Sequence, residues 1–268
     1  MILSDLHVHT SFCDGENSPE EIVRFAAERG MRYIGFSAHS NTPFDESYCI
    51  KKCAVNSYID EINRLKNKYK DKIHILCGME ADYFSPVCKK KFDYLIGSVH
   101  YVLKNGKYLP IDESPQIFAE IVSEAYGGNV FALIEDYFNL AANVLEKTSA
   151  DIIGHFDLIS KFNEGNAFFD EKSEKYGGIW KKAAERLAAF GKPFEINTGA
   201  ISRGYRSEAY PSVDMLKFIK SLGGSFILSS DSHKKESLMF KFDEYEALSK
   251  RIGLSFVNVE NLIGKSEA

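Results

Sequence analysis

The sequence lacks several features that define large classes of proteins. It contains no apolar stretch that approaches the roughly 20 residues of a transmembrane helix. It has no excess of basic side chains, because 33 lysines and arginines stand against 38 aspartates and glutamates, giving a formal net charge of −5. Broad affinity for nucleic acid or for a membrane surface usually needs a basic face. The sequence therefore argues against both kinds of partner.

Motifs of several enzyme classes are also missing. There is no Gly-x-Ser-x-Gly sequence, no activated-cysteine motif and no Walker loop, so none of these offers a competing mechanism. The five cysteines are an odd number and include no Cys-x-x-Cys pair. Because the N-terminal segment MILSDLHVHT predicts a strand rather than a signal peptide, we expect free thiols in a reducing, cytoplasmic setting.

What the sequence does contain is an alternation of apolar strand-like runs and helical periods. The predicted strands are 2–6, 33–37, 73–79, 94–99, 152–154, 194–196 and 225–229. The predicted helices are 19–29, 55–69, 115–126, 130–148, 175–190 and 213–222. Near-continuous apolar strands are typical of a parallel sheet covered on both faces. With no linker or repeat to divide the chain, we expect one α/β domain over residues 1–268, and a barrel rather than an open sheet.

Histidines and carboxylates occur where these strands end. Six of the seven histidines and three carboxylates do so: His7, His9, Asp14, His39, Glu80, His100, His155, Asp231 and His233. His7 and His9 are two residues apart, so on an extended chain both side chains point to the same side. In a closed barrel the carboxyl ends of the strands converge on one face. Since histidine and carboxylate are ligands of divalent metals, the sequence predicts a metal centre there.

These residues also carry a family resemblance. The segments DLHVHT, FSAHS, GMEAD, GSVH, GHFDLI and SSDSH together resemble the PHP superfamily, the polymerase and histidinol phosphatase domain. The resemblance runs nearly from end to end and is closest to the histidinol-phosphate phosphatase branch, including YLPIDESP and FEINTGAISRGYRSEAYPS. It implies a distorted, TIM-like (β/α)7 barrel that holds three divalent ions, which could be zinc, iron or manganese.

The resemblance also implies how the ligands are shared among the ions. The first ion would take His7, His9, Glu80 and Asp231. The second would take His100, His155 and the same Glu80, which would bridge the two. The third would take Asp14, His39 and His233.

Such a centre predicts the hydrolysis of a small phosphate monoester. Three divalent ions would outweigh the charge of the carboxylates and leave an electropositive pocket that suits a phosphate dianion. Metal coordination lowers the pKa of water from about 16 to roughly 7. We therefore expect a hydroxide bridging the first two ions to attack phosphorus in line, with Asp231 or His233 assisting the leaving alkoxide. The resemblance implies L-histidinol phosphate as the substrate, in histidine biosynthesis.

Other residues in the loops after the strands are candidates for substrate contact. The resemblance favours Lys161, after the fifth strand, and Arg203, after the sixth, as phosphate contacts. Arg206 is a further candidate, and for all three the alternative is a solvated loop charge. Asn197, at the end of the sixth strand, is expected to orient a ligand or the substrate, and the alternative is that it simply caps the loop.

Two residues keep two interpretations each. Asp112 could offer a carboxylate to the amine of the substrate, or it could simply precede the helix start at Ser114-Pro115. Cys13, beside Asp14, could approach a metal, or it could be a small buried residue of the loop.

Two other functions stay open at this point. A PHP-type phosphoesterase could instead act on a nucleotide, a phosphotyrosine protein or a nucleic-acid strand, although the negative net charge argues against the last. A non-catalytic, metal-stabilised module would be expected to have lost ligands, whereas this sequence has the full set. The sequence gives no indication of the oligomeric state.

Overall fold

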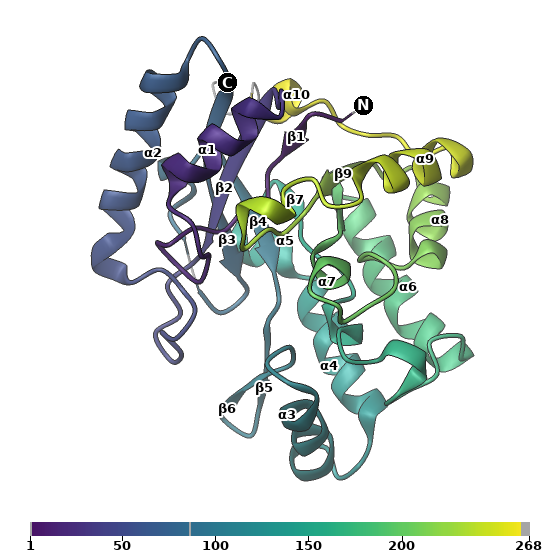
Figure 1. The fold of residues 1–268 in the computed structure, drawn as a ribbon. Helices are drawn as coiled ribbons and strands as arrows, with labels where there is room; N and C mark the ends of the chain where they lie inside the picture. Colours follow the sequence, from purple (N-terminus) through teal and green to yellow (C-terminus); the bar gives the residue numbers. More distant parts are fainter. Residues whose placement is uncertain (1, 86, 264–268) are drawn as a thin grey trace.

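Seven parallel strands form the centre of the molecule in the computed structural model, which describes residues 2–85 and 87–263 (Figure 1). They are β1 (Ser4–Asp5), β2 (Tyr33–His39), β3 (His74–Asp82), β4 (Tyr94–Ser98), β7 (Ile152–Ile153), β8 (Phe194–Asn197) and β9 (Phe226–Ser229), and they neighbour one another in that order. All pairings between them are parallel. The carboxyl ends of the strands therefore lie at the same edge.

The two outer strands of this sheet meet and nearly close it into a barrel. Just beyond β1 and β9, Val8 and Ser232 form an isolated parallel bridge. The N–H of His9 donates to the carbonyl of Ser232 at 2.8 Å, and the N–H of Ser232 donates to the carbonyl of His7 at 3.1 Å. The expected α/β, seven-stranded (β/α) barrel is therefore confirmed. Its closure runs through the segment that carries the His7 and His9 side chains.

Helices connect the strands and cover the outside of the sheet (Figure 1). The α-helices are α1 (Pro19–Glu28), α2 (Val55–Tyr69), α3 (Pro115–Glu120), α4 (Val130–Ala141), α5 (Val144–Thr148), α6 (Glu174–Ala188), α7 (Gly199–Ser202), α8 (Val213–Ser221), α9 (Phe242–Ile252) and α10 (Val259–Ile263). Short 3-10 turns cover Lys52–Ala54, Lys89–Lys91, Leu158–Ser160, Glu164–Asn166 and Lys235–Ser237, and a π-helical turn, Ile121–Ala125, follows α3. An antiparallel hairpin, β5 (Tyr101–Lys104) with β6 (Lys107–Pro110), projects beside α3 at the bottom of Figure 1.

Within the described ranges, no single helix is long and apolar enough to cross a membrane. One pair, Pro115–Ala125 with Val130–Ala141, has the required length and composition together, but it is bent by 103°.

Most of the predicted elements are confirmed, with some differences in their bounds. The helix predicted over 55–69 is α2, residue for residue. The helix predicted over 130–148 is divided, because α4 ends at Ala141 and α5 begins at Val144. The first strand is shorter than expected and covers only Ser4–Asp5. The sequence did not predict the β5–β6 hairpin or helix α9.

The barrel interior beneath the carboxyl ends of the strands is packed around Tyr94. Its side chain is fully buried, and its hydroxyl donates to the carbonyl oxygens of Leu6 at 2.5 Å and Phe36 at 3.2 Å. Gly35 and Gly78 make room for the ring, because a Cβ atom at either position would collide with Tyr94. Gly78 and Glu80 lie on the same face of β3 because side chains alternate along a strand, so this packing forms the floor beneath Glu80.

Candidate metal centre

The nine side chains expected to bind metal lie together at the carboxyl ends of the barrel strands. His39 and Glu80 belong to β2 and β3 themselves and are direct partners in the register of these two strands. The others follow β1, β4, β7 and β9: His7, His9, Asp14, His100, His155, Asp231 and His233. All except Asp14 and His233 are buried. The remaining histidine, His74, starts β3, is exposed and stacks on Tyr33.

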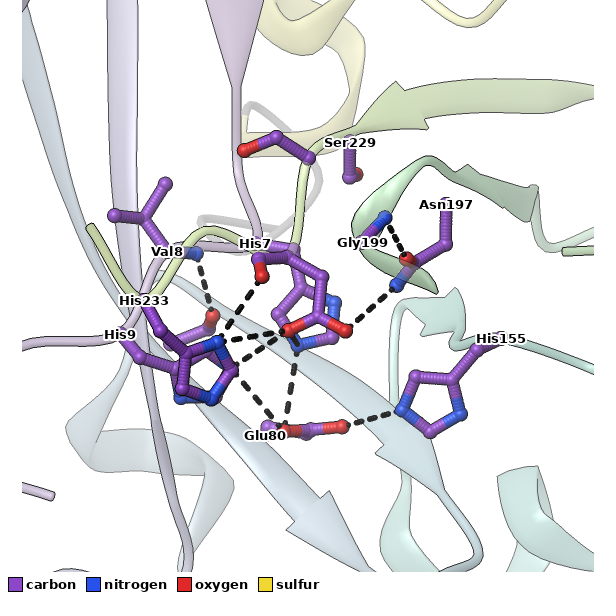
Figure 2. A network of polar contacts seen from close by, with 12 residues as sticks. His7, Val8, His9, Glu80, His155, Asn197, Gly199, Ser229 and His233 are labelled. Atoms are coloured by element: carbon purple, nitrogen blue, oxygen red, sulfur yellow. Dashed lines mark hydrogen bonds and ion pairs between the residues drawn. The ribbon is translucent and has the colours of Figure 1, made fainter. Parts of the chain in front are cut away.

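Glu80 lies in the middle of this cluster (Figure 2). Its Oε1 atom lies 2.8 Å from Nε2 of His155 and 3.4 Å from Nε2 of His100. Its Oε2 atom lies 2.8 Å from Nδ1 of His39 and 3.3 Å from Nε2 of His7. The two oxygens therefore face different imidazoles, which is the arrangement a carboxylate needs to bridge two metal ions.

Asp231 and Asp14 contact the imidazoles of His9, His39 and His233, with Asp231 on the buried side of these rings and Asp14 on the exposed side. Oδ1 of Asp231 lies 3.2 Å from Nε2 of His9 and 3.7 Å from Nδ1 of His233. Oδ2 of Asp14 lies 3.1 Å from Nε2 of His233 and 3.6 Å from Nε2 of His39. The ring of His9 stacks on both His39 and His233, with centroids 4.2 Å apart in each case. Asp14, His39 and His233 thus form an outer group.

This set of donor atoms fits divalent metal ions. Buried polar atoms are normally hydrogen-bonded, yet Nε2 of His7, Nε2 of His9 and Oε2 of Glu80 form no well-aligned hydrogen bond with any described residue. Their close contacts are only with one another and with other potential ligands. Unpartnered imidazole nitrogens and carboxylate oxygens that face one another are suitable ligands for zinc, iron or manganese. Four sets of such atoms lie within 4.8 Å of one another: His9–Asp14–His39–His233, His7–Glu80–His155, His7–His9–Asp231 and His39–Glu80–His100.

These sets agree with part of the expected sharing of ligands. His100 and His155, expected on one ion, fall in different sets, each with Glu80, and further contacts appear. His9 approaches the outer group as well as His7 and Asp231. His39, expected only in the outer group, also approaches Glu80 and His100. The sequence could not predict these contacts because they depend on how the rings stack.

The carboxylates and imidazoles strongly affect one another's ionisation. Burial alone would raise the pKa of Glu80, but the neighbouring imidazoles of His39 and His7 outweigh it and hold this pKa well below its usual range. Burial opposes the charged form of His39, but the carboxylates of Glu80 and Asp14 raise its pKa to about 9. Burial and the neighbouring imidazoles lower the pKa of His9 to about 3. Without metal the carboxylates therefore retain protons on nearby rings, and metal binding would release them.

Two buried carboxylates that the sequence analysis did not select hold the outer nitrogens of metal-binding rings. Glu195 of β8 places Oε1 2.6 Å from Nδ1 of His7. Asp82, at the end of β3, places Oδ2 3.2 Å from Nδ1 of His100. The signal that could have identified Asp82 is the alternation along β3, because Asp82 follows Glu80 by two residues and shares its face.

A cavity of about 380 Å³ opens beside the cluster. Its wall includes the ligands Glu80, His100, His155 and Asp231, together with residues from loops and from the β5–β6 hairpin. Lys161 and Arg203, both expected at the site, line this cavity, as does Asp112. Tyr48, Tyr101 and Tyr205 add aromatic surface. The cavity is therefore small, partly aromatic and charged.

The structure corrects the expectation for Arg206. Its side chain is only 5% exposed, and Nη1 donates to the carbonyl of Ser160 at 3.1 Å and to Oε1 of Glu171 at 2.7 Å. Nη2 donates to Oε2 of Glu171 at 3.0 Å. The described residues that line the cavity beside the cluster do not include Arg206. Arg206 ties together the loops that carry Ser160 and Glu171, and the cavity lining gives it no place in a substrate site.

Asn197 also differs from the expectation of direct substrate contact. It is fully buried, and its Nδ2 atom donates to Oε2 of Glu195 at 3.0 Å and to Oδ2 of Asp231 at 3.3 Å. Its Oδ1 atom accepts from the N–H of Gly199 at 2.8 Å. Asn197 therefore orients Asp231, one of the expected metal ligands, and through Gly199 it also caps its own loop.

Cys13 lies close to the ligands, but its thiol is held in the neutral form. Its Sγ atom is 3.6 Å from Nδ1 of His9. Burial, with the charge of Asp14, raises the pKa of the thiol to about 12. Cys13 belongs to none of the four sets of potential ligands, so the interpretation of Cys13 as a small residue of the loop is favoured.

A barrel of this topology with histidine and carboxylate ligands at its carboxyl edge defines a family of metal-binding proteins. Residues 5–199 match the PHP domain, and the chain belongs to this family. Asp231 and His233 lie beyond the matched residues, on the segment that closes the barrel.

Two curated proteins resemble the chain over most of its length. It is 29% identical over 255 residues to "Probable histidinol-phosphatase" of Deinococcus radiodurans, covering 90% of each chain. It is also 29% identical over 250 residues to the protein of the same description from Schizosaccharomyces pombe, covering 85% of this chain and 79% of that one.

A solved structure shares the fold. The crystal structure of histidinol phosphate phosphatase from Lactococcus lactis, complexed with zinc, L-histidinol and phosphate, matches with a TM-score of 0.68. The two chains are 22% identical, and the match covers 96% of this chain and 95% of the other.

Proposed function

We propose that this protein is a metal-dependent phosphomonoesterase that hydrolyses L-histidinol phosphate to L-histidinol and phosphate, in the cytoplasmic pathway of histidine biosynthesis. The observation that carries the proposal is the complete cluster of nine potential ligands beside a small cavity. Two relatives, which match 85% and 90% of this chain, are described as probable histidinol-phosphatases. The cavity volume lies within the range of small-molecule sites.

The proposed cofactor is a set of three divalent ions, zinc, iron or manganese. His7, His9 and Asp231 would hold the first, and Asp14, His39 and His233 the third. His100 and His155, which both approach Oε1 of Glu80, would hold the second with Glu80, which the first ion would share. When bound, such ions neutralise phosphate charge and make hydroxide available near neutral pH. The proximity of the donor atoms and the unpartnered nitrogens of His7 and His9 support this assignment.

Arg203 and Lys161 would bind the phosphate oxygens. Nη2 of Arg203 donates to Oδ2 of Asp231 at 2.9 Å, so its guanidinium is held next to a metal ligand with part of its surface facing the cavity. Nζ of Lys161 donates to the carbonyl of Asp112 at 2.7 Å and lies 3.2 Å from its Oδ2 atom. These contacts orient both cations before substrate arrives, which reduces the entropy lost on binding.

Beside Lys161, the cavity also offers groups that suit the cationic part of the substrate. Asp112 contributes a carboxylate that would attract the amine, and Tyr48, Tyr101 and Tyr205 offer faces against which an imidazole would pack. The hydroxyl of Tyr101 donates to Oδ2 of Asp45 at 2.7 Å, which fixes this ring at the start of β5.

His233 or Asp231 would assist the departure of the leaving alkoxide. Both line the cavity, and Nδ1 of His233 lies 3.7 Å from Oδ1 of Asp231. The side chain of His233 is 23% exposed and that of Asp231 is 8% exposed, so His233 exchanges protons with solvent more easily.

The test is the release of phosphate from L-histidinol phosphate by purified, manganese-supplemented protein, beside p-nitrophenyl phosphate and a nucleoside monophosphate. We expect a kcat/KM of roughly 10⁴ M⁻¹s⁻¹ or above for L-histidinol phosphate, much lower values for the other two, and no turnover after chelation. Equal, weak activity on all three substrates would retain the phosphoesterase and reject L-histidinol phosphate. Full turnover in metal-depleted protein would reject the metal-dependent mechanism.

A further inference from the structure

We propose that Glu195 is a positioning residue for the metal centre, which sets the ring tautomer of His7 and joins the ligands of two of the metal groups. The inference rests on the proposed function only in that it takes the cluster to hold divalent ions. Glu195 is fully buried on the inner face of β8. Each of its hydrogen bonds leads to a metal-binding residue.

The first contact determines which nitrogen of His7 is available. Oε1 of Glu195 lies 2.6 Å from Nδ1 of His7, and both side chains are completely buried. An ionised carboxylate only accepts hydrogen bonds, so Nδ1 must carry the proton. The neutral ring then presents the lone pair of Nε2, which has no hydrogen-bond partner in the described structure and lies 3.3 Å from Oε2 of Glu80. Glu195 therefore directs the metal-binding nitrogen of His7 into the cluster.

The second oxygen of Glu195 acts on other ligands. Oε2 accepts from the backbone N–H of His155 at 2.9 Å and from Nδ2 of Asn197 at 3.0 Å. Nδ2 of Asn197 is also 3.3 Å from Oδ2 of Asp231. One carboxylate thus fixes the side chain of His7, the main chain of His155 and, through an amide, the side chain of Asp231. These residues follow three different strands, β1, β7 and β9.

A glutamine of the same size cannot satisfy all three donors. If its amide oxygen faces His7, its NH₂ group meets two donors, the N–H of His155 and Nδ2 of Asn197. If the amide is turned, its NH₂ group faces Nδ1 of His7 and favours the tautomer with the proton on Nε2. Either orientation leaves a buried donor without an acceptor or turns the wrong nitrogen toward the metal.

The experiment compares Glu195→Gln with a matched control, Asp151→Asn. Asp151 lies just before β7 at the opposite end of the barrel, is 9% exposed and also receives three donors. Its Oδ2 atom accepts from the N–H of Leu95, and its Oδ1 atom from Lys89 and Lys192. It approaches none of the metal groups formed by the described residues. Both variants lose one buried charge, so general destabilisation should be similar.

Zinc content is measured by elemental analysis after equilibration over a series of buffered free zinc concentrations. We expect Glu195→Gln to need about 10–100-fold more free zinc to fill its first sites, while Asp151→Asn fills as the wild type does. In the zinc-loaded wild type, ¹⁵N-resolved NMR of the His7 ring should show a proton on Nδ1 and metal on Nε2.

Unchanged zinc binding by Glu195→Gln, or metal on Nδ1 of His7 in the wild type, would overturn the inference. The NMR measurement keeps it testable even if the variant does not fold. No substrate enters either measurement, so the result does not depend on which phosphate ester is hydrolysed. A wild-type protein that binds no zinc would instead overturn the metal centre on which both proposals rest.

Discussion

Glu80 and His155 face each other across the barrel, with Oε1 of the carboxylate 2.8 Å from Nε2 of the ring, although they are 75 residues apart in the sequence. The other oxygen of Glu80 lies 2.8 Å from Nδ1 of His39. The carboxylate of Glu80 lies within 3.6 Å of a ring nitrogen of each of five histidines: His7, His9, His39, His100 and His155. Glu80 is therefore the residue whose loss should affect the largest part of the metal centre.

Glu80→Ala should abolish turnover and reduce the number of bound ions. Loss of a residue that only supports a ligand costs about 10–100-fold in metal affinity or activity, so removal of a shared ligand should cost more than a hundredfold in kcat/KM. The measurements are phosphate release and metal content of the purified variant. A variant that keeps full metal content and loses less than tenfold in rate would contradict a bridging role.

Arg203→Ala should mainly weaken substrate binding. Charge-assisted hydrogen bonds contribute about 1.5–3 kcal/mol, and each 1.4 kcal/mol is a factor of ten, so kcat/KM should fall by about tenfold to a hundredfold, chiefly through KM. Arg203→Lys keeps the charge but loses the fork of two N–H groups, and we expect an intermediate value. Steady-state kinetics with L-histidinol phosphate and inhibition by inorganic phosphate provide the test. An unchanged KM with a lower kcat would place Arg203 elsewhere in the reaction.

Arg206→Ala should behave in the opposite way, although the two arginines are only three residues apart. Its guanidinium donates to Glu171 through two nitrogens, at 2.7 and 3.0 Å, and is almost completely buried. Removing it leaves the Glu171 carboxylate and the Ser160 carbonyl without these donors. We expect a loss of about 2–3 kcal/mol in the free energy of unfolding, measured by urea denaturation, with KM within a factor of two or so of the wild type. A large rise in KM at unchanged stability would contradict this structural role and show that Arg206 contacts the substrate.

The contrast between these arginines explains how far the sequence could predict the site. Each member of the cluster of potential ligands could be selected because its residue type and its place at or after a strand end were both visible, and a barrel brings all strand ends together. Arg203 and Arg206 occupy the same loop and look equivalent in the sequence. Which one faces the cavity depends on Glu171, a residue 35 positions away whose contact with Arg206 exists only in the folded chain.

The same limit applies to the fold. Strand and helix positions follow from apolar periodicity, so α2 could be predicted completely. The break between α4 and α5 depends on packing, and the β5–β6 hairpin consists of two short strands, of which β6 is largely exposed. Glu195 was overlooked because a charged residue inside an apolar strand gives no sign of its partner until His7 is brought to it.

Two glycines with opposite surroundings provide a test of the barrel packing. A Cβ atom at Gly78 would collide with the ring of Tyr94 inside the barrel, whereas a Cβ atom at Gly177, within helix α6, would meet nothing within 4 Å. Gly78→Ala should therefore lower the free energy of unfolding by about 1–3 kcal/mol, because a close-packed interior must shift to accept a methyl group. Gly177→Ala should raise it by roughly 0.5–1 kcal/mol, because alanine loses less backbone entropy in a helix. Urea denaturation of both variants checks the signs.

Because Gly78 shares its strand face with Glu80, Gly78→Ala should also weaken zinc binding, while Gly177→Ala should leave it unchanged. Equal effects of the two substitutions on stability would show that Tyr94 does not fill the barrel as described.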